Sequence, residues 1–105
     1  MPYFILLGRD RPGTAALRSR LRPEHQAYFY APQEGCRGVA GGPLLDDAGE
    51  AMIGTLLVFE AVDRGAVDRF FAADPYNRGG LFERVQIWPW RWGLGRPQPC
   101  DPASS

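Results

Sequence analysis

The chain contains a single histidine, His25, in a segment that could perform acid–base chemistry. A histidine changes charge near neutral pH, so it can take up and release a proton during a reaction. Arg22 comes one helical turn before His25 and could hold an anionic substrate beside it. The alternative is a histidine that packs against a sheet with one ring nitrogen hydrogen-bonded. Its position alone leaves both interpretations open.

Asp74 is the second candidate, within the sequence FFAADPYNRGG at residues 70–80. The residue before a proline avoids the helical conformation, so a helix is predicted to end at Asp74-Pro75. An aspartate in such a turn commonly accepts hydrogen bonds from backbone N–H groups one or two residues further on. It could instead orient and charge a histidine, as carboxylates do in catalytic dyads and triads. That second role requires Asp74 to lie near His25 in the fold.

Short apolar segments bounded by turn residues predict four strands. The predicted strands cover residues 3–7, 35–42, 53–59 and 82–88. The second of these is glycine-rich and is expected to end at its Gly-Gly-Pro sequence. Turn chemistry in the sequence DDAG at residues 46–49 should join the second and third strands as an antiparallel hairpin.

Two helices are predicted between the strands. The first covers residues 14–30, and the residues at helical spacing on its predicted inward face are Leu17, Leu21, His25 and Tyr28. Pro23 is expected to kink or divide this helix, because proline removes a backbone donor and crowds the preceding turn. The second helix should begin after Asp63, a residue type that favours the N-cap position. Its apolar face is formed by Ala66, Val67, Phe70 and Phe71.

This order of elements is typical of an α+β fold of the ferredoxin-like βαββαβ type, with a four-stranded antiparallel sheet and both helices on one face. The helices leave the other face of the sheet uncovered, and a small domain avoids exposing a whole apolar sheet face to water. A second copy packed sheet to sheet would cover that face, so a homodimer is expected. Because both helices share one face, the end of the second helix at Asp74 can approach His25 on the first.

Composition narrows the classes of function. The 105 residues suit one small domain, and twelve acidic residues balance twelve basic ones, which argues against nucleic acid or a charged membrane as a partner. Every basic residue is arginine, so no lysine amine is available for Schiff-base chemistry. Two cysteines and one histidine are too few for a structural zinc site, and no apolar run is long enough to span a membrane. We therefore expect a cytoplasmic protein that needs no metal or cofactor.

The chain resembles the YciI-like (YCII-related) family in three separated segments. These segments are LRPEH at residues 21–25, GCRGVAGGPLLDDAGE at residues 35–50 and ADPYNRGGLFERVQIWPW at residues 73–90. The resemblance implies a ferredoxin-like fold that dimerises by packing sheets, in the dimeric α/β-barrel group. Members carry a histidine and an aspartate in a pocket, which correspond to His25 and Asp74.

The resemblance also bears on domain organisation and activity. It implies one YCII-related domain over residues 1–92, and it leaves residues 93–105 as a tail rich in Gly, Pro and Ser. The family is regarded as one of enzymes, and a few relatives act on hydroxylated or chlorinated aromatic compounds. One fold hosts many chemistries, so the family by itself does not define a reaction.

The resulting hypothesis is a small cofactor-independent enzyme in which a His25–Asp74 dyad transfers a proton on a small, cyclic or aromatic, anionic substrate. Isomerisation, elimination or dehalogenation would suit such a dyad. The expected substrate-binding residues, an arginine for the anionic group and aromatic residues as walls, are Arg22, Tyr28, Tyr76 and Trp88. One alternative is a non-catalytic dimer that binds a small molecule or serves as an accessory protein. Another is a cofactor-free oxygenase.

Overall fold

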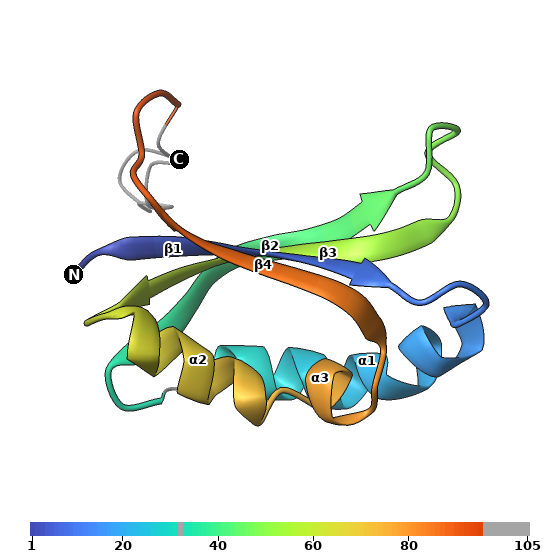
Figure 1. Ribbon diagram of the computed structural model, residues 1–105, viewed down its shortest axis with the longest axis horizontal. Helices are drawn as coiled ribbons and strands as arrows, with labels where there is room; N and C mark the ends of the chain where they lie inside the picture. Colours follow the sequence, from blue (N-terminus) through green and yellow to red (C-terminus); the bar gives the residue numbers. More distant parts are fainter. Residues whose placement is uncertain (32, 96–105) are drawn as a thin grey trace, which may run out of the picture.

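A computed structural model describes residues 1–31 and 33–95 and shows a four-stranded antiparallel sheet with all helices on one face (Figure 1). The strands are β1 (Tyr3–Asp10), β2 (Cys36–Leu45), β3 (Met52–Ala61) and β4 (Phe82–Trp90). The helices are α1 (Ala15–Tyr30), α2 (Arg64–Ala72) and the single turn α3 (Pro75–Arg78). The strands lie in the order β2-β3-β1-β4, so the predicted ferredoxin-like α+β fold is confirmed.

The hydrophobic core lies between the sheet and the helices. Alternate residues of β1 and β3 point to this side, and Phe4 pairs with Phe59 while Leu6 pairs with Leu57 across the two central strands. All four side chains are buried, together with Phe70 of α2. Burying side chains of this size contributes roughly 1.5–3 kcal/mol each, so this layer holds the helices against the sheet.

The other face of the sheet carries apolar side chains but no described helix (Figure 1). Ile5 of β1 pairs with Trp88 of β4, and Leu7 pairs with Leu56 of β3. Trp88 is 55% exposed, although an indole ring is among the largest apolar groups a protein can bury. We call Ile5, Leu7, Leu56 and Trp88 the open sheet face.

Helix α1 differs from the sequence prediction in two respects. Pro23 does not divide it, because this residue lies on the exposed side of α1, where water can reach the Ser19 carbonyl that loses its backbone partner. Its most buried residues are Arg18, His25 and Phe29, whereas the predicted inward residues Leu17, Leu21 and Tyr28 are only half-buried. The inward face of α1 is therefore partly charged.

Strand β2 is longer than predicted. It continues through the Gly-Gly-Pro sequence to Leu45, and Pro43 pairs with Thr55 of β3. A proline is tolerated here because β2 is an edge strand with a neighbour on one side only.

The predicted turn and helix cap are confirmed. Asp46 Oδ1 accepts a 2.9 Å hydrogen bond from the Glu50 N–H, and Gly49 takes a φ of 74°, which suits glycine. Asp63 caps α2 by accepting a 2.9 Å hydrogen bond from the Ala66 N–H.

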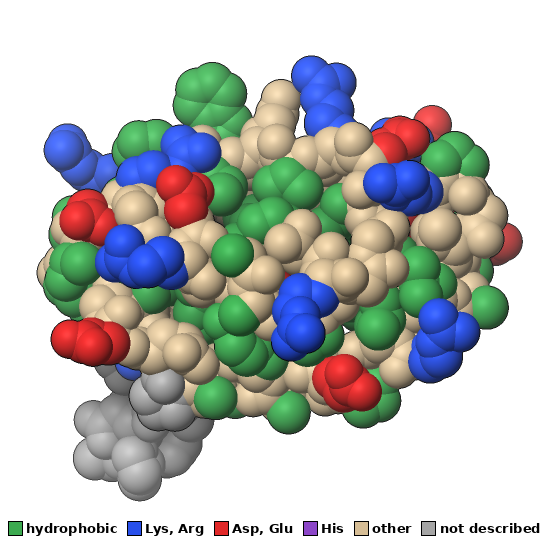
Figure 2. All heavy atoms as spheres, turned by 60° about the horizontal axis from the view of Figure 1, so that its bottom comes forward, with side chains coloured by type: hydrophobic (Ala, Val, Ile, Leu, Met, Phe, Trp, Pro, Cys, Tyr) green, Lys and Arg blue, Asp and Glu red, His purple; other side chains and the backbone are tan. Residues whose placement is uncertain are grey.

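The surface on the helix side mixes arginine and acidic side chains without a continuous field of one sign (Figure 2). None of the described helices is long and apolar enough to cross a bilayer. Most of the predicted C-terminal tail, residues 96–105, lies outside the described residues.

Candidate active site

The fold brings His25 of α1 and Asp74, at the start of α3, into direct contact. The His25 Nδ1 atom lies 2.8 Å from Asp74 Oδ1. The two side chains are only 9% and 1% exposed, so bulk water does not separate or screen them. The buried pair that the second role of Asp74 requires is therefore present.

Asp74 performs its local role at the same time. It is the N-cap of α3, and its Oδ1 atom also accepts a 2.9 Å hydrogen bond from the Tyr76 N–H. Pro75 occupies the first helical position, where a proline costs no hydrogen bond. The end of α3 lies close to α1, because a side chain at Gly79 would collide with Leu21. The turn thus places the carboxylate at a defined position beside α1.

The ring of His25 is held by a second contact. Its centroid lies 3.8 Å from that of Tyr76, with the planes inclined by 9°, and Tyr76 is buried. A carboxylate only accepts hydrogen bonds, so neutral His25 carries its proton on Nδ1 and leaves a lone pair on Nε2. No described residue hydrogen-bonds to Nε2, and no buried side-chain nitrogen lacks a partner in the described chain. Nε2 therefore opens to the adjoining cavity.

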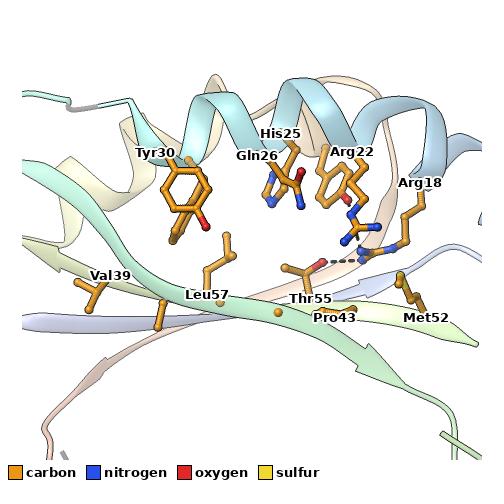
Figure 3. A pocket seen from close by; sticks show the side chains of 15 residues that line it. Arg18, Arg22, His25, Gln26, Tyr30, Val39, Pro43, Met52, Thr55 and Leu57 are labelled. Carbon is orange, nitrogen blue, oxygen red and sulfur yellow. Dashed lines mark hydrogen bonds between the residues drawn. The ribbon is translucent and has the colours of Figure 1, made fainter. Parts of the chain in front are cut away.

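That cavity of about 310 Å³ lies between α1 and the strands β2 and β3 (Figure 3). Six residues of α1 line it, namely Arg18, Arg22, His25, Gln26, Phe29 and Tyr30. Arg22 and Thr55 lie toward one end and Tyr30 and Val39 toward the other, with His25 between them (Figure 3). One end is therefore polar and cationic, and the other is aromatic and apolar.

An ion pair absent from the predicted site residues forms the polar end. Arg18 binds Asp10 through two hydrogen bonds of 2.7 and 3.0 Å, and both side chains are 6% exposed. The same guanidinium donates to Thr55 Oγ1 and, at 3.5 Å, to the Tyr76 hydroxyl. Arg18 precedes His25 by two helical turns, and this spacing is the one sequence signal that indicates a shared face.

Of the four predicted substrate-binding residues, two line the cavity and two do not. Arg22 and Tyr76 line the cavity with His25, and Arg22 forms no ion pair with a described residue. Tyr28 does not line it, since its hydroxyl donates a 2.7 Å hydrogen bond to the Phe70 carbonyl beside the core. Trp88 lies on the open sheet face, with the sheet between it and the cavity.

Burial governs the titration of the neighbouring phenol and thiol groups. It raises the pKa of Tyr76, although the Arg18 and Arg22 charges oppose this, so the phenol stays protonated at neutral pH. Burial also raises the pKa of the Cys36 thiol to about 11, which disfavours the nucleophilic thiolate. Within residues 1–31 and 33–95, no three His, Cys, Asp or Glu side chains cluster as metal ligands would.

The sequence profile of the YCII-related domain matches residues 1–91. The chain belongs to the YCII-related domain family. The resemblance inferred from the sequence is thereby confirmed. No protein with a curated description is significantly similar in sequence.

Solved structures similar to this YCII-related protein include 5-chloro-2-hydroxyhydroquinone dehydrochlorinase (TftG) from Burkholderia phenoliruptrix, in complex with 2,5-dihydroxybenzoquinone. It is 28% identical, with a TM-score of 0.75 over 85% of this chain and 93% of that chain. SnoaB, a cofactor-independent oxygenase from Streptomyces nogalater, is 17% identical, with a TM-score of 0.57 over 90% of this chain and 98% of that chain. At this identity, SnoaB supports the fold alone.

Proposed function

We propose that this YCII-related protein is a cofactor-independent enzyme that transfers a proton on a small, cyclic, anionic substrate. The observation that carries the proposal is the 2.8 Å contact between His25 Nδ1 and Asp74 Oδ1, with Nε2 of the same ring open to a cavity. His25 is the catalytic base, and Asp74 orients the ring and stabilises the imidazolium that forms.

The proposed step needs no oxidant or reductant. Nε2 of His25 accepts a proton from an acidic O–H or C–H group of the substrate. In an elimination, the halogen-bearing carbon is tetrahedral, as in the keto tautomer of a halogenated hydroxyarene. The electron pair left by the proton forms the new C=O or C=C bond, and the halide leaves with the electrons of its bond to carbon. The net change is loss of one proton and one halide ion. In an isomerisation, the same nitrogen returns the proton to a different atom.

The shape and charge of the cavity support a ring-shaped anion as substrate. About 310 Å³ is at the lower end of small-molecule sites and suits one substituted ring. Arg22 supplies a positive charge that no described carboxylate neutralises, whereas the charge of Arg18 is paired with Asp10. The apolar end, with Phe29 and Leu57, would hold the part of the ring that carries no charge.

The likeness to TftG adds support for one reaction class. That protein is named as a dehydrochlorinase of a chlorinated hydroxyhydroquinone, and its structure holds a dihydroxybenzoquinone. A ring bearing hydroxyl groups and a halogen can form a keto tautomer in which the halogen-bearing carbon has gained a proton. That tautomer has the acidic proton and the leaving group that the proposed elimination requires. Halogenated hydroxyhydroquinones are therefore the first substrates to test.

The test measures chloride release from 5-chloro-2-hydroxyhydroquinone by the purified protein and its variants. His25→Gln and Asp74→Asn should each lower kcat about 10²- to 10⁴-fold, the usual contribution of a positioned acid–base group. The amide introduced by Asp74→Asn still presents an oxygen to cap α3, so thermal unfolding should change little. Asp68→Asn, which alters an exposed aspartate of α2, is the matched control and should leave kcat unchanged.

Two results would contradict the proposal. If both site variants keep full kcat on every substrate turned over, the dyad performs no proton transfer. If a panel of halogenated and non-halogenated hydroxyaromatic anions binds but none is converted, the protein is instead a small-molecule-binding or accessory protein.

We also propose that two copies pack through the open sheet face. The exposed Trp88 ring and the apolar side chains beside it support this arrangement, because a second sheet would remove them from water. In sedimentation velocity, the wild type should be a dimer and Trp88→Asp a monomer. Val62→Asp, at a residue of matching exposure between β3 and α2, should stay dimeric. A monomeric wild type would contradict the proposal.

A further inference from the structure

The hydrogen bonds of Arg18 determine which atoms are left for a ligand at the polar end of the cavity. A guanidinium has five N–H groups and no acceptor. Arg18 uses two of them on Asp10, one on Thr55 Oγ1 and one on the Tyr76 hydroxyl. The charge and most of the donors of Arg18 are thus already committed within the protein.

The hydrogen bonds from Arg18 leave the Thr55 and Tyr76 hydroxyl groups able to donate. Each oxygen accepts a hydrogen bond from Arg18, because arginine can only donate. Each hydroxyl hydrogen is then available, and neither Thr55 nor Tyr76 uses it on another described residue. Both side chains are nearly fully buried, at 3% and 2% exposure, and both line the cavity. Two buried hydroxyl donors therefore face the same ligand space.

We propose that the hydroxyls of Thr55 and Tyr76 form a paired donor site for one enolate or phenolate oxygen of the ligand. This inference rests on the proposed function insofar as the same cavity holds the substrate. Arg18 is a positioning residue in this arrangement, since it turns both hydroxyl hydrogens away from itself. Arg18 links the two oxygens, because they accept from the two terminal nitrogens of its guanidinium.

Electrostatics favours an oxyanion over a neutral oxygen at this position. A hydroxyl that accepts from a cation is polarised and becomes a stronger donor. Burial keeps the Tyr76 phenol protonated, so it has a proton to donate at neutral pH. Fixed donors in a site shielded from water cost little reorganisation when charge develops on the bound oxygen.

The donor site also complements the base. The Tyr76 ring stacks on His25, so the donor site and the base are parts of one packed group of side chains. When Nε2 removes a proton from a planar ligand, the ligand is left with a negative charge. Conjugation carries this charge to an oxygen on the side of the ligand away from Nε2. Thr55 and Tyr76 would receive that oxygen, while Arg22 balances the overall charge.

The test uses 4-nitrophenolate as the probe, at a pH where it is ionised, and measures its Kd and its absorption band. Tyr76→Phe and Thr55→Val each remove one hydroxyl and keep the size of the side chain. Each should weaken binding about 10- to 100-fold, the range for one hydrogen bond to a charged group. Each should also move the band of the bound phenolate toward longer wavelength. Matched controls outside the cavity, Tyr3→Phe and Thr14→Val, should change neither value.

Several outcomes would overturn the inference. It fails if the wild type does not bind the phenolate, or if both hydroxyl-free variants bind it with the wild-type Kd and band. Should Thr55→Val not fold, Tyr76→Phe decides together with Thr55→Ser, which keeps the hydroxyl and should bind as the wild type does. If Thr55→Ser loses as much affinity as Tyr76→Phe, a role for the hydroxyl of residue 55 is contradicted.

The outcome is separable from that of the proposed enzymatic function. His25→Gln removes the base but keeps both donors, so it should still bind the phenolate and lose turnover. If the hydroxyl variants lose phenolate affinity while no substrate is ever converted, the donor site stands and the catalytic proposal fails. If turnover depends on His25 and Asp74 but removing either hydroxyl leaves the phenolate Kd unchanged, the catalytic proposal stands and the donor site fails.

Discussion

His25 and Tyr76 stack face to face, with centroids 3.8 Å apart and planes inclined by 9°. Asp74 joins them, because its Oδ1 atom binds both His25 Nδ1 and the Tyr76 N–H. These three residues therefore behave as one unit, in which the cap of a single helical turn also aligns an imidazole. The stability of the turn and the orientation of the base depend on the same side chains.

The buried stack predicts a large difference between two substitutions at one position. Tyr76→Ala removes the ring and should lower the free energy of unfolding by about 3–5 kcal/mol, as for other large buried aromatics. Tyr76→Phe keeps the stack and should cost only about 1 kcal/mol. Urea unfolding measures both, with Tyr30→Ala, at an 80% exposed residue, as control. A Tyr76→Ala variant as stable as the Tyr30→Ala control would refute the packing role.

The buried Arg18–Asp10 pair predicts strong coupling between its members. Arg18→Met should cost about 3–5 kcal/mol of unfolding free energy, because it leaves the Asp10 carboxylate buried without a cation. The double variant Arg18→Met/Asp10→Leu should recover part of this loss. A double-mutant cycle by urea unfolding measures the coupling. The exposed pair Arg64–Asp68 is the control and should couple by less than about 1 kcal/mol. Purely additive effects at the buried pair would contradict this prediction.

The glycine-rich strand β2 predicts opposite outcomes at two nearby glycines. A methyl group at Gly38 would collide with the Phe29 ring, so Gly38→Ala should lower the unfolding free energy by about 1–3 kcal/mol. A methyl group at Gly42 meets nothing within 4 Å, so Gly42→Ala should be neutral or slightly stabilising. Thermal unfolding of the two variants side by side provides the comparison. Equal melting temperatures would show that α1 does not press on β2 at Gly38.

The buried Cys36 thiol predicts a loss of stability at high pH. Its pKa rises from the usual 9.0 to about 11 on folding, because burial disfavours the thiolate. Between these values the unfolded chain binds fewer protons than the folded one, so stability falls as pH rises through this window. The loss should be on the order of 2 kcal/mol by pH 11.

Comparing two variants isolates this thiol. Cys100→Ser and Cys100→Ser/Cys36→Ala share every other titrating group, so the difference in their pH dependence belongs to Cys36. The difference in unfolding free energy should be constant below about pH 8 and shrink above pH 9. A difference that stays constant to pH 11 would mean that the thiol ionises in the folded protein as readily as in the unfolded chain.

The strands, the hairpin turn and the cap at Asp63 follow from local sequence, because alternation, turn chemistry and capping act over a few residues. Where a prediction from local sequence was wrong, the surrounding tertiary structure explains the difference. Pro23 does not break α1, since it lies on the exposed side of the helix. Strand β2 continues through Pro43, since an edge strand tolerates the missing donor. Sheet position and helix orientation are not visible in a window of ten residues.

Some features of the candidate site likewise follow from the sequence, and others only from the tertiary structure. The sequence alone determined the element order, the end of a helix at Asp74 and the presence of a single histidine on the first helix. Only the tertiary structure decided that Asp74 reaches His25, that Arg18 is paired with Asp10, and that Trp88 lies beyond the sheet. The reason is physical: hydrogen bonds and ion pairs depend on distances between residues far apart in the chain, and these distances are set only when α1 and α3 pack together on the sheet.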